Sequence, residues 1–123
     1  MKVKIVLFFG LLFGFAVSAQ SLIITNNENR GLNFGEVRVG TTKTETLELK
    51  NNGNQPIIIS SVIFSSETLS SNITLPLELA PNATASFNLT ASPTSLQRES
   101  LYFTIKYNSE EDYISKVYLK PIQ

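Results

Sequence analysis

A run of alternating apolar and polar residues between two turn signals does most to limit how this chain can fold. In the run Lys43 to Asn51, KTETLELKN, the two leucines Leu47 and Leu49 point one way and their neighbours are polar. A period of two with one apolar face predicts a half-buried β-strand. The Asn-Asn-Gly turn at residues 51–53 should end it, because Asn and Gly tolerate left-handed backbone. The chain is therefore built around a strand with one buried face.

Similar short strands are predicted along the rest of the chain, and no stretch has a convincing helical period. Ile57 and Ile59 are out of phase with Val62 and Phe64, which predicts a β-bulge near residues 60–61. Pro76 marks an edge strand, since proline cannot donate to a ladder. Short strands separated by turns favour an antiparallel β-sandwich of about seven to eight strands. Phe34-Gly35 and Val39-Gly40 are expected to break the backbone before the central strand, and Phe34, Val37 and Val39 are expected to enter the core there. The expected strands cover residues 22–24, 43–51, 56–64, 73–79, 84–90, 99–107 and 112–120, with connections at 65–72 and 91–98.

The last two predicted strands form a hairpin whose register can be derived from its turn. If residues 108–111 hold the turn, Leu101 lies opposite Leu119, Phe103 opposite Val117 and Ile105 opposite Ser115. All of these except Ser115 are apolar. The hairpin therefore has one coherent inner face, as a sandwich requires.

Residues 1–19 have the pattern of a signal peptide and are not expected to belong to the fold. Lys2 and Lys4 form a positive region, an apolar run follows, and Val17-Ser18-Ala19 is an Ala-x-Ala-like cleavage site. The alternatives are a buried helix or a membrane anchor, but the run is short for a bilayer. We expect residues 20–123 to form one exported domain, periplasmic or extracellular, that meets the membrane only during export.

Composition excludes several kinds of site. The 123 residues include no histidine and no cysteine, which removes Ser-His-Asp and Cys-His catalysis, the usual zinc ligands and any disulfide. Without the two lysines of the signal peptide, eight basic and ten acidic side chains give a net charge of −2, and no basic run predicts nucleic-acid binding. No cofactor motif is present.

The remaining chemistry is carried by carboxylates and by asparagines. Glu110, Glu111 and Asp112 could contribute to a calcium site, although calcium loops spread their ligands over a longer segment, so a solvated hairpin tip is favoured. A carboxylate-based hydrolase would use Glu99, Glu110, Glu111 or Asp112, but acid and base must face each other across a cleft. Three tripeptides match the N-glycosylation pattern, at Asn72, Asn82 and Asn88, although turns and exposed strand positions also use these residue types.

The segment LNFGEVRVGTTKTETLELKNNGNQPIIISSVIF resembles the opening of Hydin-type immunoglobulin-like domains. The pattern is a Phe-Gly, a Val-x-x-Gly, an alternating strand, Asn-x-Gly and a proline followed by aliphatic residues. The resemblance covers nearly all of the predicted domain and implies a sandwich that acts as a protein-interaction or scaffolding module. Asn82 stands where the family usually has a glycine in a later turn. The positions that carry the structural motif are Phe34, Gly35, Gly40, Asn51, Gly53 and Pro56.

The predicted function is that of a non-catalytic exported binding or structural module with an unknown protein partner. One alternative is a chaperone or subunit of a surface fibre that works by strand addition at a sheet edge. In immunoglobulin-like sandwiches the third strand and the last two share a sheet. Its outer face would collect the candidate partner-binding residues Ile58, Tyr102, Ile114 and Tyr118, whereas the other sheet would show ordinary polar side chains. The alternative for the two tyrosines is a cross-strand pair that stabilises the hairpin.

Overall fold

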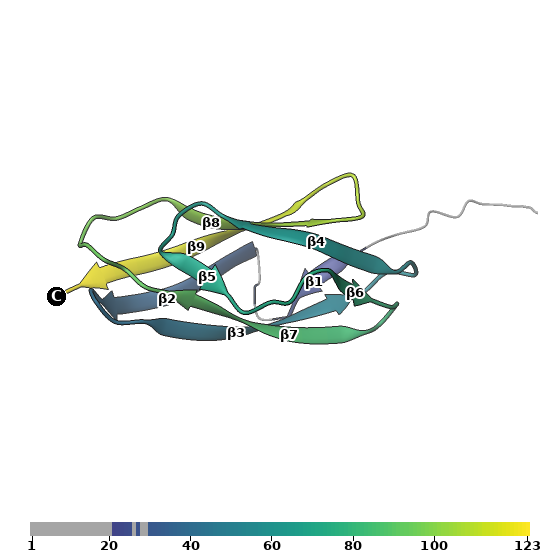
Figure 1. Cartoon of the computed structure of the whole chain (residues 1–123), viewed down its shortest axis with the longest axis horizontal. Helices are drawn as coiled ribbons and strands as arrows, with labels where there is room; N and C mark the ends of the chain where they lie inside the picture. The colour runs from purple at the N-terminus through teal and green to yellow at the C-terminus, as the bar shows by residue number, and fades with distance from the viewer. Residues whose placement is uncertain (1–20, 26, 28–29) are drawn as a thin grey trace, which may run out of the picture.

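The computed structural model describes residues 21–25, 27 and 30–123, and these form nine β-strands in two packed sheets (Figure 1). The predicted signal peptide lies outside the described residues. Within the described part of the chain, no helix is long and apolar enough to cross a membrane. The strands are β1 (Leu22–Ile24), β2 (Gly31–Arg38), β3 (Lys43–Asn51), β4 (Ile57–Phe64), β5 (Leu69–Ser71), β6 (Leu77–Leu79), β7 (Thr84–Ala91), β8 (Leu101–Tyr107) and β9 (Tyr113–Ile122).

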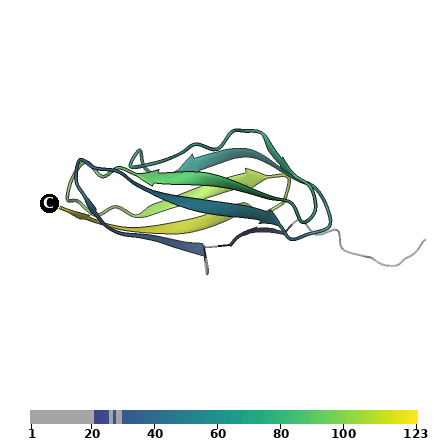
Figure 2. The ribbon, with the colours of Figure 1, turned by 90° about the horizontal axis from the view of Figure 1, so that it is seen from below.

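The two sheets lie face to face along the long axis of the molecule (Figure 2). One has the order β1-β3-β7-β5 and the other the order β2-β9-β8-β4-β6. All described strand pairs are antiparallel except β2 with β9, which is parallel. The parallel pair arises because the chain passes from one sheet at β1 to the other at β2. The predicted β-sandwich is confirmed.

The core is the set of inward-facing apolar side chains of both sheets. Leu47 and Leu49 are fully buried on β3, as the alternating pattern predicts. Phe34 and Phe103 fill the core from the opposite sheet. Val39, which was also expected in the core, is only half-buried. One apolar layer between two sheets is what the periodicity of the sequence requires.

Three of the residues expected in turns have left-handed backbone, and a fourth does not. Gly35, Gly40 and Asn82 all have positive φ, at 71°, 86° and 68°. Gly35 does not end its strand, however, because it sits at a register shift inside β2. At Gly53 the expected left-handed backbone is absent: its N–H donates to the side-chain oxygen of Asn51 (3.0 Å), which closes the turn instead.

The β4 bulge is confirmed, but two expectations for the segment after β4 were wrong. The register of β4 against β8 shifts between Ile59 and Ser61, as expected. Residues 65–72 were expected to be a connection, yet they contain β5, which pairs with the end of β7. The strand expected over residues 73–79 is shorter, because only Leu77–Leu79 pair with β4, after Pro76. β6 lies at the edge of its sheet, as the proline predicts.

The predicted register of the β8–β9 hairpin was wrong by two residues. Leu101 lies opposite Val117, not Leu119, and Phe103 lies opposite Ser115. The ladder with β9 ends at the pair of Ile105 and Tyr113, so the connection is longer than the four residues assumed. Asn108 in this connection is held against β4, where its side chain accepts from the N–H of Ile58 (2.9 Å). A two-residue shift keeps every side chain on its predicted face, since side chains alternate with a period of two.

Candidate functional site

The outer face of the five-stranded sheet carries a cluster of exposed apolar and aromatic side chains. Tyr102, at the start of β8, is 45% exposed. The other exposed members lie around it: Ile63 on β4 at 48%, Ile114 on β9 at 51% and Tyr118 on β9 at 53%. We call Ile63, Tyr102, Ile114 and Tyr118 the tyrosine patch.

Strand pairing explains why these four residues meet. Ile63 lies opposite Thr104, and Thr104 lies opposite Ile114, so the two isoleucines share one row across β4, β8 and β9. Tyr102 occupies the next row, directly opposite Lys116. Tyr118 is two residues further along β9 and is therefore a diagonal neighbour of Tyr102, within reach of an aromatic side chain. The tyrosine patch is thus continuous over three strands.

The corrected register changes the relation between the two tyrosines. They were expected to lie directly opposite each other, but Lys116 occupies that place opposite Tyr102. Tyr118 lies over the neighbouring strand instead: a Cβ atom at Gly31 of β2 would come within 3.1 Å of its ring. The tyrosines therefore do not form the direct pair that would assign them a purely stabilising role.

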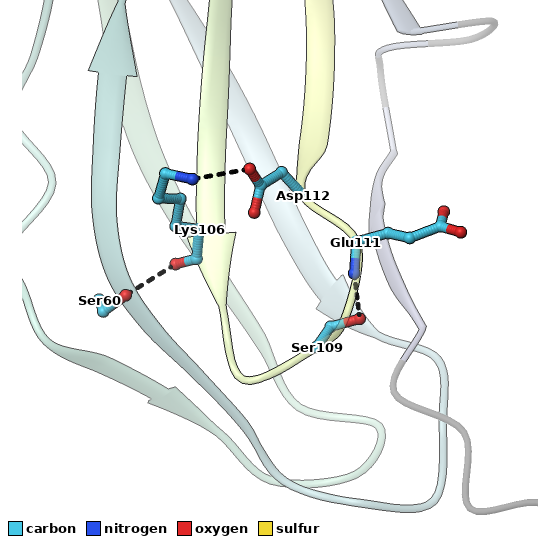
Figure 3. A network of polar contacts seen from close by, with 5 residues as sticks. All are labelled: Ser60, Lys106, Ser109, Glu111 and Asp112. Carbon is cyan, nitrogen blue, oxygen red and sulfur yellow. Dashed lines mark hydrogen bonds and ion pairs between the residues drawn. The ribbon is translucent and has the colours of Figure 1, made fainter.

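Ile58 is exposed on the same sheet but is separate from the tyrosine patch. It is 43% exposed and lies opposite Glu78 of β6. Between it and Ile63 stand the bulge and the ion pair of Lys106 with Asp112 (2.8 Å), shown in Figure 3 with the bond from Ser60 to the Lys106 carbonyl. Sequence reasoning missed Ile63, although the bulge that turns Val62 and Phe64 inward also turns Ile63 outward.

Two open hollows lie on this face, on either side of Tyr118. The larger, about 600 Å³, is lined by Tyr102, Ile114, Lys116 and Tyr118 together with residues 99–101 and 117. The smaller, about 340 Å³, is lined by Tyr118 with polar residues that include Asn33 and Arg98. Volumes of this size fall in the range of small-ligand pockets, which are usually concave and partly apolar. The tyrosine patch is therefore bordered by hollows and is not a flat surface.

The outer face of the four-stranded sheet has a different character. Its strands carry cross-strand polar pairs: the hydroxyls of Thr44 and Thr90 lie 3.0 Å apart, and Thr46 donates to the side-chain oxygen of Asn88 at 2.8 Å. The backbone N–H of Asn88 also donates to the side-chain oxygen of Asn72 (2.7 Å). These residues already satisfy one another, as expected for a solvated surface.

The carboxylates considered as catalytic or metal-binding groups are not brought together. In Figure 3 Asp112 points toward Lys106, whereas the Glu111 side chain points away from both. Glu99 precedes β8 and Glu110 follows it, so the seven-residue strand separates them by roughly 20 Å. Glycosidase carboxylates lie about 5–9.5 Å apart. Among the described residues, no group of three or more acidic side chains could hold a metal ion.

Glu99 is instead held by local hydrogen bonds. Thr68 donates to its carboxylate at 2.8 Å. Hydrogen bonds from Ser66 and Thr68 lower the pKa of Glu99 below its ordinary value. A carboxylate stabilised in its charged form is a poor general acid at neutral pH.

Comparison with known proteins identifies the family. The model of the HYDIN/CFA65/VesB-like Ig-like domain matches residues 24–120. The chain belongs to this family of immunoglobulin-like domains. The match covers nearly all of the described residues, and the resemblance seen in the sequence is confirmed. Among curated proteins, none matches this HYDIN-like chain.

Solved structures show how widely this fold occurs. A protein of unknown function from Porphyromonas gingivalis W83 is 18% identical, with a TM-score of 0.68 over 90% of this chain and 52% of its own. The PapD-like domain 7 of human CEP192 is 12% identical, with a TM-score of 0.64 over 100% and 97%. The secreted serine protease VesC from Vibrio cholerae is 19% identical, with a TM-score of 0.56 over 79% and 24%. The HYDIN-like chain thus spans a quarter of VesC and about half of the P. gingivalis protein. At these identities the likeness shows the fold alone.

Proposed function

We propose that this protein is a non-catalytic, exported binding module that contacts a protein partner through the tyrosine patch. The observation that carries the proposal is the difference between the two outer faces. One face gathers Ile63, Tyr102, Ile114 and Tyr118 around open hollows, and the other is a ladder of paired polar side chains. A contiguous apolar patch on a soluble domain often marks an interaction site. Tyrosine suits such a site because it offers a large contact area and a polar tip.

The sheet edges support face binding over strand addition. In the described structure β1, β5 and β6 are edge strands of three residues each, too short to template a long partner strand. The longer edge strand, β2, is interrupted by the register shift at Gly35, and the Phe34 carbonyl there accepts a bond from the Lys43 ammonium (2.8 Å). β1 pairs only with residues 49–51 of β3, so the first part of β3 is also an open edge. There Lys43 and Glu45 stand on the inward face of the strand, where charges discourage pairing. These features are typical of edges that avoid added strands.

Export is supported by the signal-peptide pattern of residues 1–19 and by the secreted character of VesC. Absence of catalysis is supported by the separation of the carboxylates and by the lack of histidine and cysteine. The family match is to an immunoglobulin-like module, which other proteins carry beside further domains.

The test compares partner capture by the wild-type domain and by a Tyr102→Ser, Tyr118→Ser double variant. Both are immobilised after a denaturant melt has shown that they are folded, and both are exposed to the exported fraction of the native cell. We expect the wild-type domain to capture a partner protein that the double variant does not capture. An Ile23→Ser variant is the matched control, because Ile23 is also exposed (37%) but lies on the other sheet.

Two outcomes would contradict the proposal. Equal capture by wild type and the folded double variant would show that the tyrosine patch is not the site. Hydrogen-exchange protection confined to β2 or β3 on binding would instead support strand addition at an edge.

A further inference from the structure

Charges of both signs stand in and around the tyrosine patch. Lys116 lies directly opposite Tyr102 and lines the larger hollow together with Glu99. The smaller hollow is lined by two cations and two carboxylates, which are those of Arg98, Lys120, Glu36 and Glu99. This face therefore suits a partner that combines apolar surface with both signs of charge. A second copy of this chain presents that same combination.

The register of the β8–β9 hairpin decides how two such faces can meet. When two identical sheets stack through a twofold axis, the axis lies in the plane of contact. If it runs along the strands, midway between β8 and β9, each β8 residue of one copy meets its own ladder partner on β9 of the other copy. Each contact is then made twice, as in any isologous interface, and no residue of the hairpin meets its own duplicate.

Both tyrosines meet fitting groups in this pairing. Tyr102 of one copy faces Lys116 of the other, and an ammonium over an aromatic ring is a favourable cation–π contact. Continued by one row, the same register places Tyr118 against Ser100, a small residue that lines the larger hollow. The Tyr118 ring of each copy is therefore directed at the larger hollow of the other.

The ion pair of Lys106 with Asp112 extends the match toward the turn of the hairpin. These two residues follow the last ladder pair in the same register, and their charged atoms lie 2.8 Å apart within one copy (Figure 3). In the twofold pairing Lys106 of each copy faces Asp112 of the other. Packed sheets are turned by about 30° relative to each other, and the long lysine side chain can span the resulting offset. Opposite charges therefore meet across the contact.

We infer that the tyrosine patch binds a second copy of this chain, through a twofold pairing of the two five-stranded sheets. The strands β2, β9, β8 and β4, at a spacing of about 4.8 Å and over the roughly 23 Å of the seven-residue β8, give a flat area of roughly 440 Å² per copy. An interface of this size is typical of weak complexes, so the dissociation constant should be micromolar. This inference rests on the proposed function and names its partner.

Sedimentation equilibrium of the purified protein tests the pairing. Between about 5 and 500 μM we expect a monomer–dimer equilibrium with a micromolar Kd. The folded Tyr102→Ser, Tyr118→Ser double variant should dimerise at least about tenfold more weakly, because it loses two aromatic contacts that are each made twice. A wild-type protein that stays monomeric at about 500 μM would overturn the inference.

Charge reversal separates a contact between copies from a role within one copy. In Lys106→Asp, and likewise in Asp112→Lys, like charges would meet across the twofold axis, so each variant alone should dimerise about tenfold more weakly than the wild type. An equimolar mixture of the two variants brings opposite charges together again, and its heterodimer should form about as tightly as the wild-type dimer. Mixing cannot restore an ion pair within one copy. A mixture that associates no better than its components would therefore overturn the inference.

Glu48→Lys is the matched control for Asp112→Lys. It makes the same change in net charge at an exposed position of the other sheet, and it should dimerise as the wild type does. A loss as large as that in Asp112→Lys would mean that net charge, and not the proposed contact, controls association, which would also overturn the inference.

Failure of this inference can be told apart from failure of the proposed function. If the partner is a different protein, the wild type stays monomeric, while the double tyrosine variant still loses capture from the exported fraction. If the tyrosine patch is not the site, the double tyrosine variant retains capture.

Discussion

The side-chain amide of Asn27 donates a 2.8 Å hydrogen bond to the hydroxyl of Ser115, and both residues are buried. Asn27 lies in the passage from β1 to β2, and Ser115 lies on β9. The bond therefore fixes the point at which the chain changes sheets. It also explains why a serine occupies the otherwise apolar inner face of the hairpin.

Replacing Ser115 by alanine should destabilise the domain by about 1–3 kcal/mol, because a buried amide N–H would lose its acceptor. The free energy of unfolding from denaturant melts measures this loss. Ser86→Ala is the control, since Ser86 is exposed on β7 and should change stability by no more than about 0.5 kcal/mol. Similar losses in both variants would mean that the Asn27–Ser115 bond contributes little.

The two faces of β3 should respond differently to truncation. Leu49 is fully buried, so Leu49→Ala should cost about 2–5 kcal/mol of stability. Glu48 is exposed on the same strand, and Glu48→Ala should stay within about 0.5 kcal/mol. Denaturant melts of the two variants measure these changes in stability. Equal losses of stability would contradict the faces assigned to Leu49 and Glu48.

Substitution of Asn51 should lower the stability of the domain more than substitution of a polar residue at a strand end usually does. Its fully buried side chain donates to the carbonyls of Gln55 (2.7 Å) and Leu79 (3.0 Å) while accepting from Gly53. Asn51→Ala should therefore lower the free energy of unfolding by about 1–3 kcal/mol. The neighbouring Asn52→Ala, at an exposed position, is the comparison, and a loss as large there would argue against a special role for Asn51.

Alkaline pH should unfold the protein partly through Tyr113. Burial raises the pKa of Tyr113 in the folded state, with a smaller opposing effect from Arg30, whose guanidinium lies 4.3 Å from the ring centre. A raised pKa stabilises the fold below the unfolded value of about 10 and loses this effect as pH rises above it. Stability measured from pH about 8 to 11 should fall more steeply for wild type than for Tyr113→Phe. Parallel curves would contradict this.

Processing of the N-terminus can be tested on the native protein. The pattern of residues 1–19 predicts cleavage after Ala19. Mass spectrometry of the protein from its own cell should then find a chain that starts at Gln20. An intact chain that starts at Met1 would show that the segment is retained.

Much of the fold could be predicted because the strands follow from the period of the apolar residues and from the turn residues between them. The bounds of β3 agree with the prediction, and the β4 bulge follows from the phase change between Ile59 and Val62. β5 was missed because its three residues lie among serines and carry too little pattern for any period. The hairpin register was wrong because the turn was assumed to hold four residues, whereas the ladder already ends at Ile105 and Tyr113. The sequence does not show contacts between distant parts of the chain, such as the bond from Ile58 to Asn108 in this connection.

The candidate site could be predicted only in part, because the pairing of strands decides which exposed residues lie together. Alternation places Tyr102, Ile114 and Tyr118 on an outer face, but only strand pairing shows that Ile63 joins them and that Ile58 does not.

The parallel pairing of β2 with β9 has a mechanical consequence. Seven residues of β2, from Gly31 to Arg38, have partners on β9, and the Val39 N–H adds a bond to the Ile122 carbonyl (2.8 Å). A force that draws the start of β2 and the end of β9 apart would load these bonds in shear, all together, and not one after another. We therefore expect single-molecule stretching between residues 31 and 122 to meet a higher rupture force than stretching across the β8–β9 hairpin, whose antiparallel bonds can open in turn.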